Sequence, residues 1–166
     1  MTCRTASVLL ICLLSICGAR PALGRDSLGI FGEWGAFRDP QVPRCHAIAM
    51  AEPSTLAREF QPYADVAIWP RKGLRNQVHF RMSRRLKPGT GISLALGGQR
   101  FALVGGGADA WAADRRMDAA IVAAMRSAGS MTVSATDGSG KRFSNTWPLD
   151  GAASAMDAAA IGCART

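Results

Sequence analysis

Residues 146–163 read TWPLDGAASAMDAAAIGC, a stretch that predicts the end of a strand, then an alanine-rich helix, then a cysteine. Asp150 is a suitable N-cap for a helix near residues 150–161, because its carboxylate can accept hydrogen bonds from the first free amides. Gly162 is a suitable residue to end that helix. The end of the chain is therefore expected to close a sheet with a helix that carries Cys163.

The beginning of the chain has the layout of a secretory signal peptide over residues 1–24. Arg4 supplies an early positive charge, residues 6–17 are uncharged and mostly apolar, and small residues lie near the end of the segment at 22–24. The apolar run is well short of the roughly 20 residues that a spanning helix needs. We therefore expect an exported protein, periplasmic or secreted, without a transmembrane span after cleavage. Its mature part, residues 25–166, is expected to form a single domain.

Cleavage of the signal peptide would leave two of the five cysteines, Cys45 and Cys163. The periplasm and the exterior are oxidising, so two cysteines in an exported domain predict one disulfide. In the chain-entropy description a closed loop of about 100 residues contributes about 4.7 kcal/mol of stability. Two buried free thiols are the alternative that the sequence leaves open.

Basic residues outnumber acidic ones by 20 to 12, and cleavage would remove two arginines, which leaves a formal charge of +6. No acidic residue lies between Asp65 and Asp109, and many of the cations fall there. Such a segment can attract an anionic envelope or cell-surface component, including lipid headgroups, whereas the export signal and the lack of a recognition motif argue against nucleic acid. A merely solvated face is the alternative. The candidate residues for binding an anionic surface are Arg71, Lys72, Arg75, Arg81, Arg84, Arg85 and Lys87.

Alternating polar and apolar residues predict a sheet. QVHFRMSR, residues 77–84, alternates strictly, so one face packs on a core and the other is basic. ISLALGGQRFAL, residues 92–103, has two glycines at its centre and fits a two-residue hairpin turn that places Leu94 opposite Phe101. Further strands are expected over residues 28–37, 44–52, 64–69, 131–136 and 142–149.

Residues 114–128 predict the clearest helix. Asp114 is a natural N-cap, and apolar residues recur at 117, 121 and 125, which places them on one helical face. The fold class is therefore expected to be mainly β, an antiparallel β-sandwich with one or two short helices. These helices lie near residues 114–128 and 150–161.

Two glycine-containing segments resemble nucleotide-binding motifs without their context. Residues 105–110 match G-x-G-x-x-A, but the preceding strand belongs to an antiparallel hairpin and the helix begins only near Asp114. These glycines are instead expected to turn the chain so that Trp111 packs against the core. The pair Gly140-Lys141 lacks the preceding glycine and the following Ser or Thr of a phosphate loop.

The sequence contains no recognisable catalytic or metal-binding constellation. There are only two histidines, and neither an H-E-x-x-H nor a G-x-S-x-G motif occurs. His46 follows Cys45, but adjacent residues of a strand point to opposite faces, so His46 is expected to be a solvent or interface histidine. We expect no enzymatic activity, cofactor or metal, although a hydrolase with groups distant in sequence is left open.

Three segments, taken in order, carry a family resemblance: IVAAMRSAG (121–129), MTVSATDGSGKRF (131–143) and PLDGAASAMDAAA (148–160). They resemble the C-terminal signature of the invasion-associated locus B family of exported alphaproteobacterial proteins, which often also have a tryptophan in the first strand, here Trp34. The resemblance implies an antiparallel β-sandwich with one or two helices, an envelope or secreted location and, in pathogens, a part in host-cell invasion. It implies no catalytic residues.

The function expected from the sequence is therefore that of an exported, non-enzymatic protein that binds an anionic surface or a protein partner, in the setting of host-cell interaction. One alternative is a structural or stress-protective periplasmic domain without a specific ligand. The other is an unrecognised hydrolase. The sequence does not indicate an oligomeric state.

Overall fold

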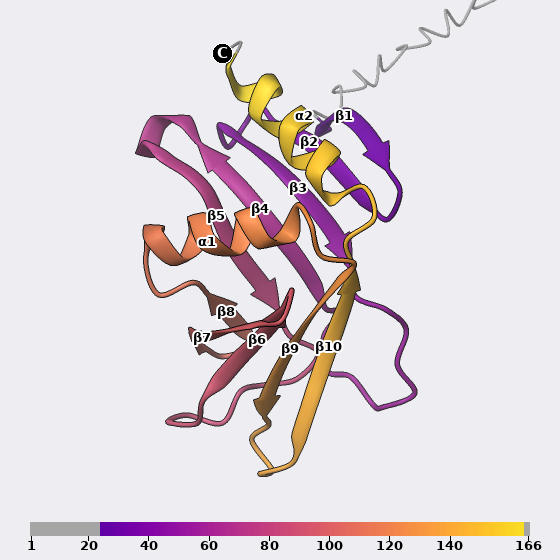
Figure 1. The fold of residues 1–166 in the computed structure, drawn as a ribbon, viewed down its shortest axis with the longest axis vertical. Coiled ribbons are helices and arrows are strands. Elements are labelled where there is room, and N and C mark those ends of the chain that lie inside the picture. The colour runs from indigo at the N-terminus through magenta and orange to yellow at the C-terminus, as the bar shows by residue number, and fades with distance from the viewer. Residues whose placement is uncertain (1–23, 165–166) are drawn as a thin grey trace, which may run out of the picture.

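The computed structural model describes residues 24–164, so the signal peptide predicted over residues 1–24 lies outside the described residues apart from Gly24. Ten strands and two α-helices make up this part of the chain (Figure 1). The strands are β1 (Asp26–Phe31), β2 (Trp34–Asp39), β3 (Arg44–Met50), β4 (Tyr63–Trp69), β5 (Leu74–Arg81), β6 (Ile92–Leu96), β7 (Gln99–Gly106), β8 (Asp109–Trp111), β9 (Ser130–Thr136) and β10 (Arg142–Pro148). The helices are α1 (Arg115–Met125), α2 (Ala152–Ala164) and the short 3₁₀ helix η1 (Pro70–Lys72). No helix in the described part of the chain has the length and apolar character needed to cross a bilayer.

The ten strands form one antiparallel sheet in the order β1-β2-β3-β4-β5-β8-β7-β6-β9-β10. Strands β1 to β5 follow chain order as a run of hairpins. Strand β8 then pairs with β5, and β9 pairs with β6, so two further hairpin units join this run through long-range pairings. Helix α2 covers β1, β2 and β3, whereas α1 packs on β5 (Figure 1).

The sheet folds over so that β10 approaches strands far from it in the sheet order. The rings of Phe80 in β5 and Trp147 in β10 lie 5.4 Å apart. Trp34 in β2 donates its indole N–H to the carbonyl of Pro148 at 2.9 Å. Both tryptophans and Phe80 are fully buried. The predicted fold class is therefore confirmed: the protein is mainly β, antiparallel and sandwich-like, with two helices.

The hairpin of β6 and β7 has the predicted register. Leu94 lies opposite Phe101, and Ile92 lies opposite Leu103. The two turn residues, Gly97 and Gly98, have φ of 56° and 78°, a conformation that the two-residue turn requires and that glycine adopts without strain. Turn chemistry and hydrophobic alternation therefore specify the same pairing.

Helix α1 begins where the sequence predicts and ends earlier. The carboxylate of Asp114 accepts a hydrogen bond from the amide of Met117 at 2.8 Å, and Ile121 and Met125 are buried. The helix ends at Met125 rather than near residue 128. The amide of Arg126 bonds to the carbonyl three residues before it, which tightens the last turn away from α-helical geometry.

The segment 28–37 is a hairpin and not the single strand that its apolar residues suggested. It contains the end of β1 and the start of β2, which pair with each other. Gly32 at the reversal has φ of 53°, a left-handed conformation that lets the chain turn tightly. Gly32 therefore marks the turn between two paired strands and not the middle of one strand.

Two details predicted for the C-terminal helix are corrected. The carbonyl of Gly151 accepts the first helical hydrogen bond, from Ala155 at 2.9 Å, so Gly151 and not Asp150 holds the N-cap position. Gly162 lies inside α2 and does not end it. A Cβ at position 162 would contact the side chain of Leu28, so this glycine allows α2 to lie close to β1.

Trp111 was expected in the core, and the structure places it on the outer face of the sheet. Strand β8 pairs with β5 on one side and β7 on the other, and its central residue, Ala110, is the one that points inward and is fully buried. Trp111 is 36% exposed and its ring stacks on His79, with centroids 5.1 Å apart. The prediction assigned Trp111 to the wrong face of the strand. Neighbouring residues of a strand face opposite sides, so only one of Ala110 and Trp111 can point into the core.

The two buried tryptophans should respond differently to replacement by phenylalanine. Trp34→Phe removes the hydrogen bond to Pro148, whereas Nε1 of Trp147 has no hydrogen-bond partner among the described residues. Losing the bonded donor should cost about 1–2 kcal/mol more than losing the unbonded one. Urea denaturation of the two variants measures this difference. Equal losses of unfolding free energy would show that the Trp34 bond contributes nothing.

Candidate functional site

The seven candidate cations do not form one continuous surface, because β5 separates them into two groups. Arg71, Lys72 and Arg75 lie in η1 and at the start of β5, and all three are exposed. Within residues 24–164 no acidic side chain forms an ion pair with any of them. We call these three residues the basic turn.

The cations at and after the other end of β5 are largely compensated by acidic partners. Arg81 bonds to Asp109 at 2.6 Å, and Arg84 bonds to Asp137 at 2.9 Å. Arg85 lies 3.7 Å from the carboxylate of Glu59. Only Lys87 of this group is exposed without an ion pair to a described residue. This second group therefore presents less net charge than its sequence suggests.

Asp137 is a firmly ionised partner for Arg84. The hydroxyl of Ser139 donates to its carboxylate at 2.6 Å and the amide of Lys141 donates at 3.0 Å. These bonds, with the Arg84 guanidinium, hold the pKa of Asp137 well below its usual range. The carboxylate therefore organises the turn between β9 and β10 and neutralises Arg84 at the same time.

A pocket of about 390 Å³ lies beside the basic turn, between the β2–β3 turn, η1 and the end of α2. Asp39 and Cys163 contribute to its lining. Its other lining residues are three arginines and three prolines, namely Arg38, Arg44, Arg71, Pro40, Pro43 and Pro70. The pocket therefore combines cationic and apolar walls.

The charged residues of this pocket differ in how strongly they are held. Arg38 donates two hydrogen bonds to Asp26, at 2.9 and 2.6 Å. Arg44 lies 3.6 Å from Asp65, beyond hydrogen-bond distance, and its guanidinium lies over the ring of Trp69 at 5.2 Å. Arg71 has no such acidic partner among the described residues. Arg44 and Arg71 are thus the arginines of this pocket whose guanidinium groups make no hydrogen bond to a described residue.

The predicted disulfide is present beside this pocket. Cys45 and Cys163 are joined with an S–S distance of 2.03 Å, and their Cα atoms lie 5.7 Å apart. Cys45 is fully buried near the start of β3, whereas Cys163 lies near the end of α2 and lines the pocket. The bond therefore fixes α2 to the sheet at the end of the molecule that carries the basic turn.

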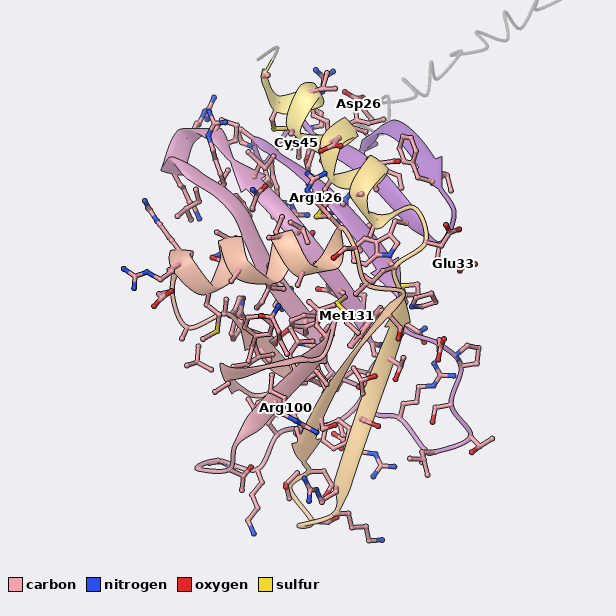
Figure 2. All side chains as sticks on the ribbon, in the orientation of Figure 1. Asp26, Glu33, Cys45, Arg100, Arg126 and Met131 are labelled. Carbon is pink, nitrogen blue, oxygen red and sulfur yellow. A yellow bond between two sulfur atoms is a disulfide. The ribbon has the colours of Figure 1, made fainter. Side chains whose placement is uncertain are left out.

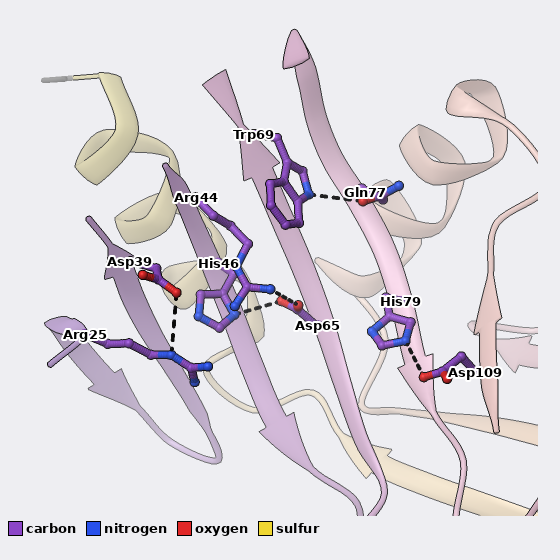
Figure 3. Close-up of polar contacts among 9 residues, drawn as sticks. All are labelled: Arg25, Asp39, Arg44, His46, Asp65, Trp69, Gln77, His79 and Asp109. Atoms are coloured by element: carbon purple, nitrogen blue, oxygen red, sulfur yellow. Dashed lines mark hydrogen bonds and ion pairs between the residues drawn. The ribbon is translucent and has the colours of Figure 1, made fainter. Parts of the chain in front are cut away.

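His46 is buried, which corrects the expectation of a solvent or interface histidine (Figure 3). Its Nδ1–H donates to the carboxylate of Asp65 at 3.0 Å, and the ring of Phe37 lies 6.0 Å away. The same carboxylate lies within ion-pair distance of Arg44. Side chains from three adjacent strands thus cover His46 on the outer face of the sheet.

A second histidine–carboxylate pair lies on the same face, where His79 donates to Asp109 at 2.9 Å (Figure 3). His79 packs between the rings of Tyr63 and Trp111, with centroids 5.6 and 5.1 Å from its own. Burial, together with the negative charges of Asp65 and Asp109, raises the pKa of Tyr63. The pocket beside the basic turn is lined by neither histidine.

Sequence reasoning missed Arg38 and Arg44 as residues of the candidate site. It followed the acid-free run from Asp65 to Asp109, and both arginines precede that run. A usable signal was available: Arg38 and Arg44 flank the turn between two predicted strands, so they must lie at the same sheet end as the turn before β5. The two aspartates that bound the run are themselves partners of Arg44 and Arg81.

Comparison of the chain with protein-family models, with curated proteins and with solved structures finds no match. The resemblance to the invasion-associated locus B family stays a prediction from sequence motifs. A function for the chain therefore has to be argued from the basic turn, the pocket and the disulfide.

Proposed function

We propose that the mature chain is an exported, non-enzymatic protein that binds an anionic envelope or cell-surface component through the basic turn. The observation that carries this proposal is the clustering of Arg71, Lys72 and Arg75 on one exposed turn without acidic partners in the described chain. Uncompensated charges raise the local potential and attract oppositely charged surfaces. The compensated cations near Arg81 and Arg84 contribute much less.

The basic turn has a defined shape. Gly73 follows η1 with φ of 61° and its amide bonds back to the carbonyl of Pro70, which closes the turn. Nζ of Lys72 lies 4.6 Å from the ring centre of Trp69, and that ring also donates its indole N–H to Gln77. These contacts hold the turn against the sheet, so its charges are presented in a fixed arrangement and less ordering entropy is lost on binding.

The disulfide and the leader-like sequence support export. Disulfides form and persist chiefly in oxidising compartments, and Cys45–Cys163 joins elements 118 residues apart. Residues 1–24 add the layout of a signal peptide. The resemblance to exported proteins with a part in host-cell invasion makes a host or envelope surface the natural setting. We therefore propose that the anionic partner is met outside the cytoplasm.

Removal of the three charges of the basic turn should abolish most binding to anionic vesicles. The triple variant Arg71→Ala/Lys72→Ala/Arg75→Ala loses three surface charges, each worth about 1 kcal/mol near an anionic membrane, so at least about tenfold weaker binding is expected. Co-sedimentation of the disulfide-bonded protein with phosphatidylglycerol-containing vesicles measures it, with pure phosphatidylcholine vesicles for comparison. Binding should also weaken between low salt and about 0.15 M salt, because salt screens exposed charges.

A matched control removes the same charge elsewhere. Lys87, Arg100 and Arg142 are exposed and have no ion pair to a described residue, and Arg100 lies in the opposite half of the molecule from Cys45 (Figure 2). Their triple alanine variant should retain most of the vesicle binding. Equal losses in the two triple variants would mean that net charge alone controls binding, and negligible binding of the unmodified protein would remove the proposal.

A further inference from the structure

We infer that the pocket between the β2–β3 turn and η1 binds one phosphate monoester group, either of a free small molecule or of a lipid headgroup. Arg44 and Arg71 are the residues that chiefly bind the phosphate. This inference rests on the proposed function and deepens it, because it names the chemistry that the basic end of the molecule would recognise. The shared ligand chemistry is a dianionic phosphate beside an apolar body.

The size and walls of the pocket suit such a ligand. Its volume of about 390 Å³ lies within the range of small-molecule sites. Pro40, Pro43 and Pro70 supply apolar surface, and the arginines lie on the same lining. Binding sites of this kind combine apolar walls with a few polar groups that fix the ligand's orientation.

The charges around the pocket favour an anion. Three arginines line it against one aspartate, Asp39. The carboxylate of Asp39 is directed to its own turn, where it accepts from the amide of Val42 at 3.3 Å, and it lies 3.9 Å from Arg25. It therefore neutralises little of the charge of Arg44 and Arg71. Arg38 and Arg44 also have acidic partners outside the lining, Asp26 and Asp65, so the positive charge that an incoming anion would balance is carried mainly by Arg71.

Arginine chemistry selects for phosphate. A guanidinium presents N–H donors in a planar fork that matches two oxygens of a phosphate or carboxylate. A phosphate monoester offers three such oxygens and carries nearly two negative charges at neutral pH. Arg44 from β3 and Arg71 from η1 can therefore contact one phosphate together, whereas a carboxylate offers only two oxygens and one charge.

Arg44 has unused hydrogen-bonding capacity at the pocket. Its Nε is buried and has no hydrogen-bond partner among the described residues. Its Nη1 lies 3.6 Å from Asp65, which is ion-pair distance without a hydrogen bond. Trp69 lies under the guanidinium and limits its orientation. Because Nε has almost no accessible surface, a phosphate in the pocket would bond to the terminal nitrogens of Arg44, whose side chain is 19% exposed and lines the pocket.

Arg75 offers a matched control for Arg71. Both are exposed arginines of the basic turn, but Arg75 lines a neighbouring cleft of about 200 Å³ that shares only Pro70 and Cys163 with the first. Charge reversal at either residue changes the net charge of the protein equally. Only the reversal at Arg71 alters the lining of the proposed phosphate pocket.

The test measures binding of phenyl phosphate to the disulfide-bonded protein by isothermal titration calorimetry. Arg71→Glu should weaken binding at least about tenfold, since it replaces a charge-assisted donor by a repelling carboxylate. Arg75→Glu should change it by no more than about twofold, as expected for an exposed charge outside the site. Both variants should reduce retention on phosphatidylglycerol vesicles to a similar extent, because the surface interaction depends on the whole basic turn.

A second measurement tests the contact with Arg44 directly. In ¹H–¹⁵N spectra the Nε–H signal of Arg44 should shift on titration with phenyl phosphate and not with an equal concentration of chloride. Arg44→Lys keeps the charge but removes the fork, so it should weaken phenyl phosphate binding. Absence of phenyl phosphate binding, or equal losses of affinity in Arg71→Glu and Arg75→Glu, would contradict the proposal that the pocket binds phosphate. Those outcomes leave vesicle binding by the basic turn unaffected, so the two proposals fail separately.

The source of the phosphate is distinguished by lipid composition. Phosphatidic acid carries a phosphate monoester headgroup, whereas phosphatidylglycerol carries a diester. Tighter retention on phosphatidic acid vesicles at equal vesicle charge, lost on addition of phenyl phosphate, supports a lipid headgroup as the ligand. Phenyl phosphate binding without any preference between the two vesicles supports a soluble phosphate monoester. Preference for phosphatidic acid that persists in Arg71→Glu would contradict the assignment of the pocket.

Discussion

Reduction of the Cys45–Cys163 disulfide is expected to lower the free energy of unfolding by about 4–5 kcal/mol. The bond closes a loop with a sequence separation of 118, and in the chain-entropy description a loop of this length restricts the unfolded chain by about that amount. Since small domains are commonly stable by only about 5–15 kcal/mol, this loss is a large part of the total. Urea denaturation with and without dithiothreitol measures it.

The double variant Cys45→Ser/Cys163→Ser provides the control. It should unfold at about the same urea concentration as the reduced protein, and dithiothreitol should not affect it further. The oxidised protein should also contain no titratable thiol among residues 25–166, where these are the only cysteines. Two free thiols in protein purified from an oxidising compartment, or an unfolding free energy insensitive to reduction, would contradict the prediction.

Replacement of Gly151 by alanine is expected to destabilise the protein by about 3 kcal/mol or more. Gly151 has φ of 81°, and holding an L-residue in this region costs about 1–3 kcal/mol. A Cβ at this position would also collide with the backbone carbonyl of Phe31. Backbone atoms cannot rotate away as a side chain can, so the start of α2 would have to move off the turn between β1 and β2. Thermal and urea unfolding measure the loss.

Gly129→Ala is the matched control for this substitution. Gly129 does not have a positive φ, and a Cβ added there would meet no atom within 4 Å. This variant should unfold close to the unmodified protein. Similar losses in the two glycine variants would show that the close approach of α2 to Phe31 does not govern stability.

Local chemistry allowed some parts of the fold to be predicted from the sequence. The hairpin of β6 and β7 was predictable because its two turn glycines and its alternating residues specify one register. The start of α1 was predictable because Asp114 caps it directly. Both features depend on residues within a few positions of each other.

Features that depend on distant residues were not predictable in this way. Alternation places His46 on the outer face of β3, but it does not show that Phe37 and Asp65 from the neighbouring strands would enclose it. The charge pattern was misleading for a similar reason. The partners of Arg81 and Arg84 lie 28 and 53 residues further along the chain, so their compensation cannot be seen in a local run of charges.

The strand order also has a consequence for the time course of folding. Strands β1 to β5 pair with their chain neighbours, and such short loops close quickly because little chain entropy is lost. Helix α2, in contrast, docks on β1, β2 and β3, more than 100 residues away, and its surface of contact exists only once those strands have paired. We therefore expect α2 to join last. The covalent bond at its end then acts after the sheet has formed: it slows escape from the native state and does little to guide the chain toward it.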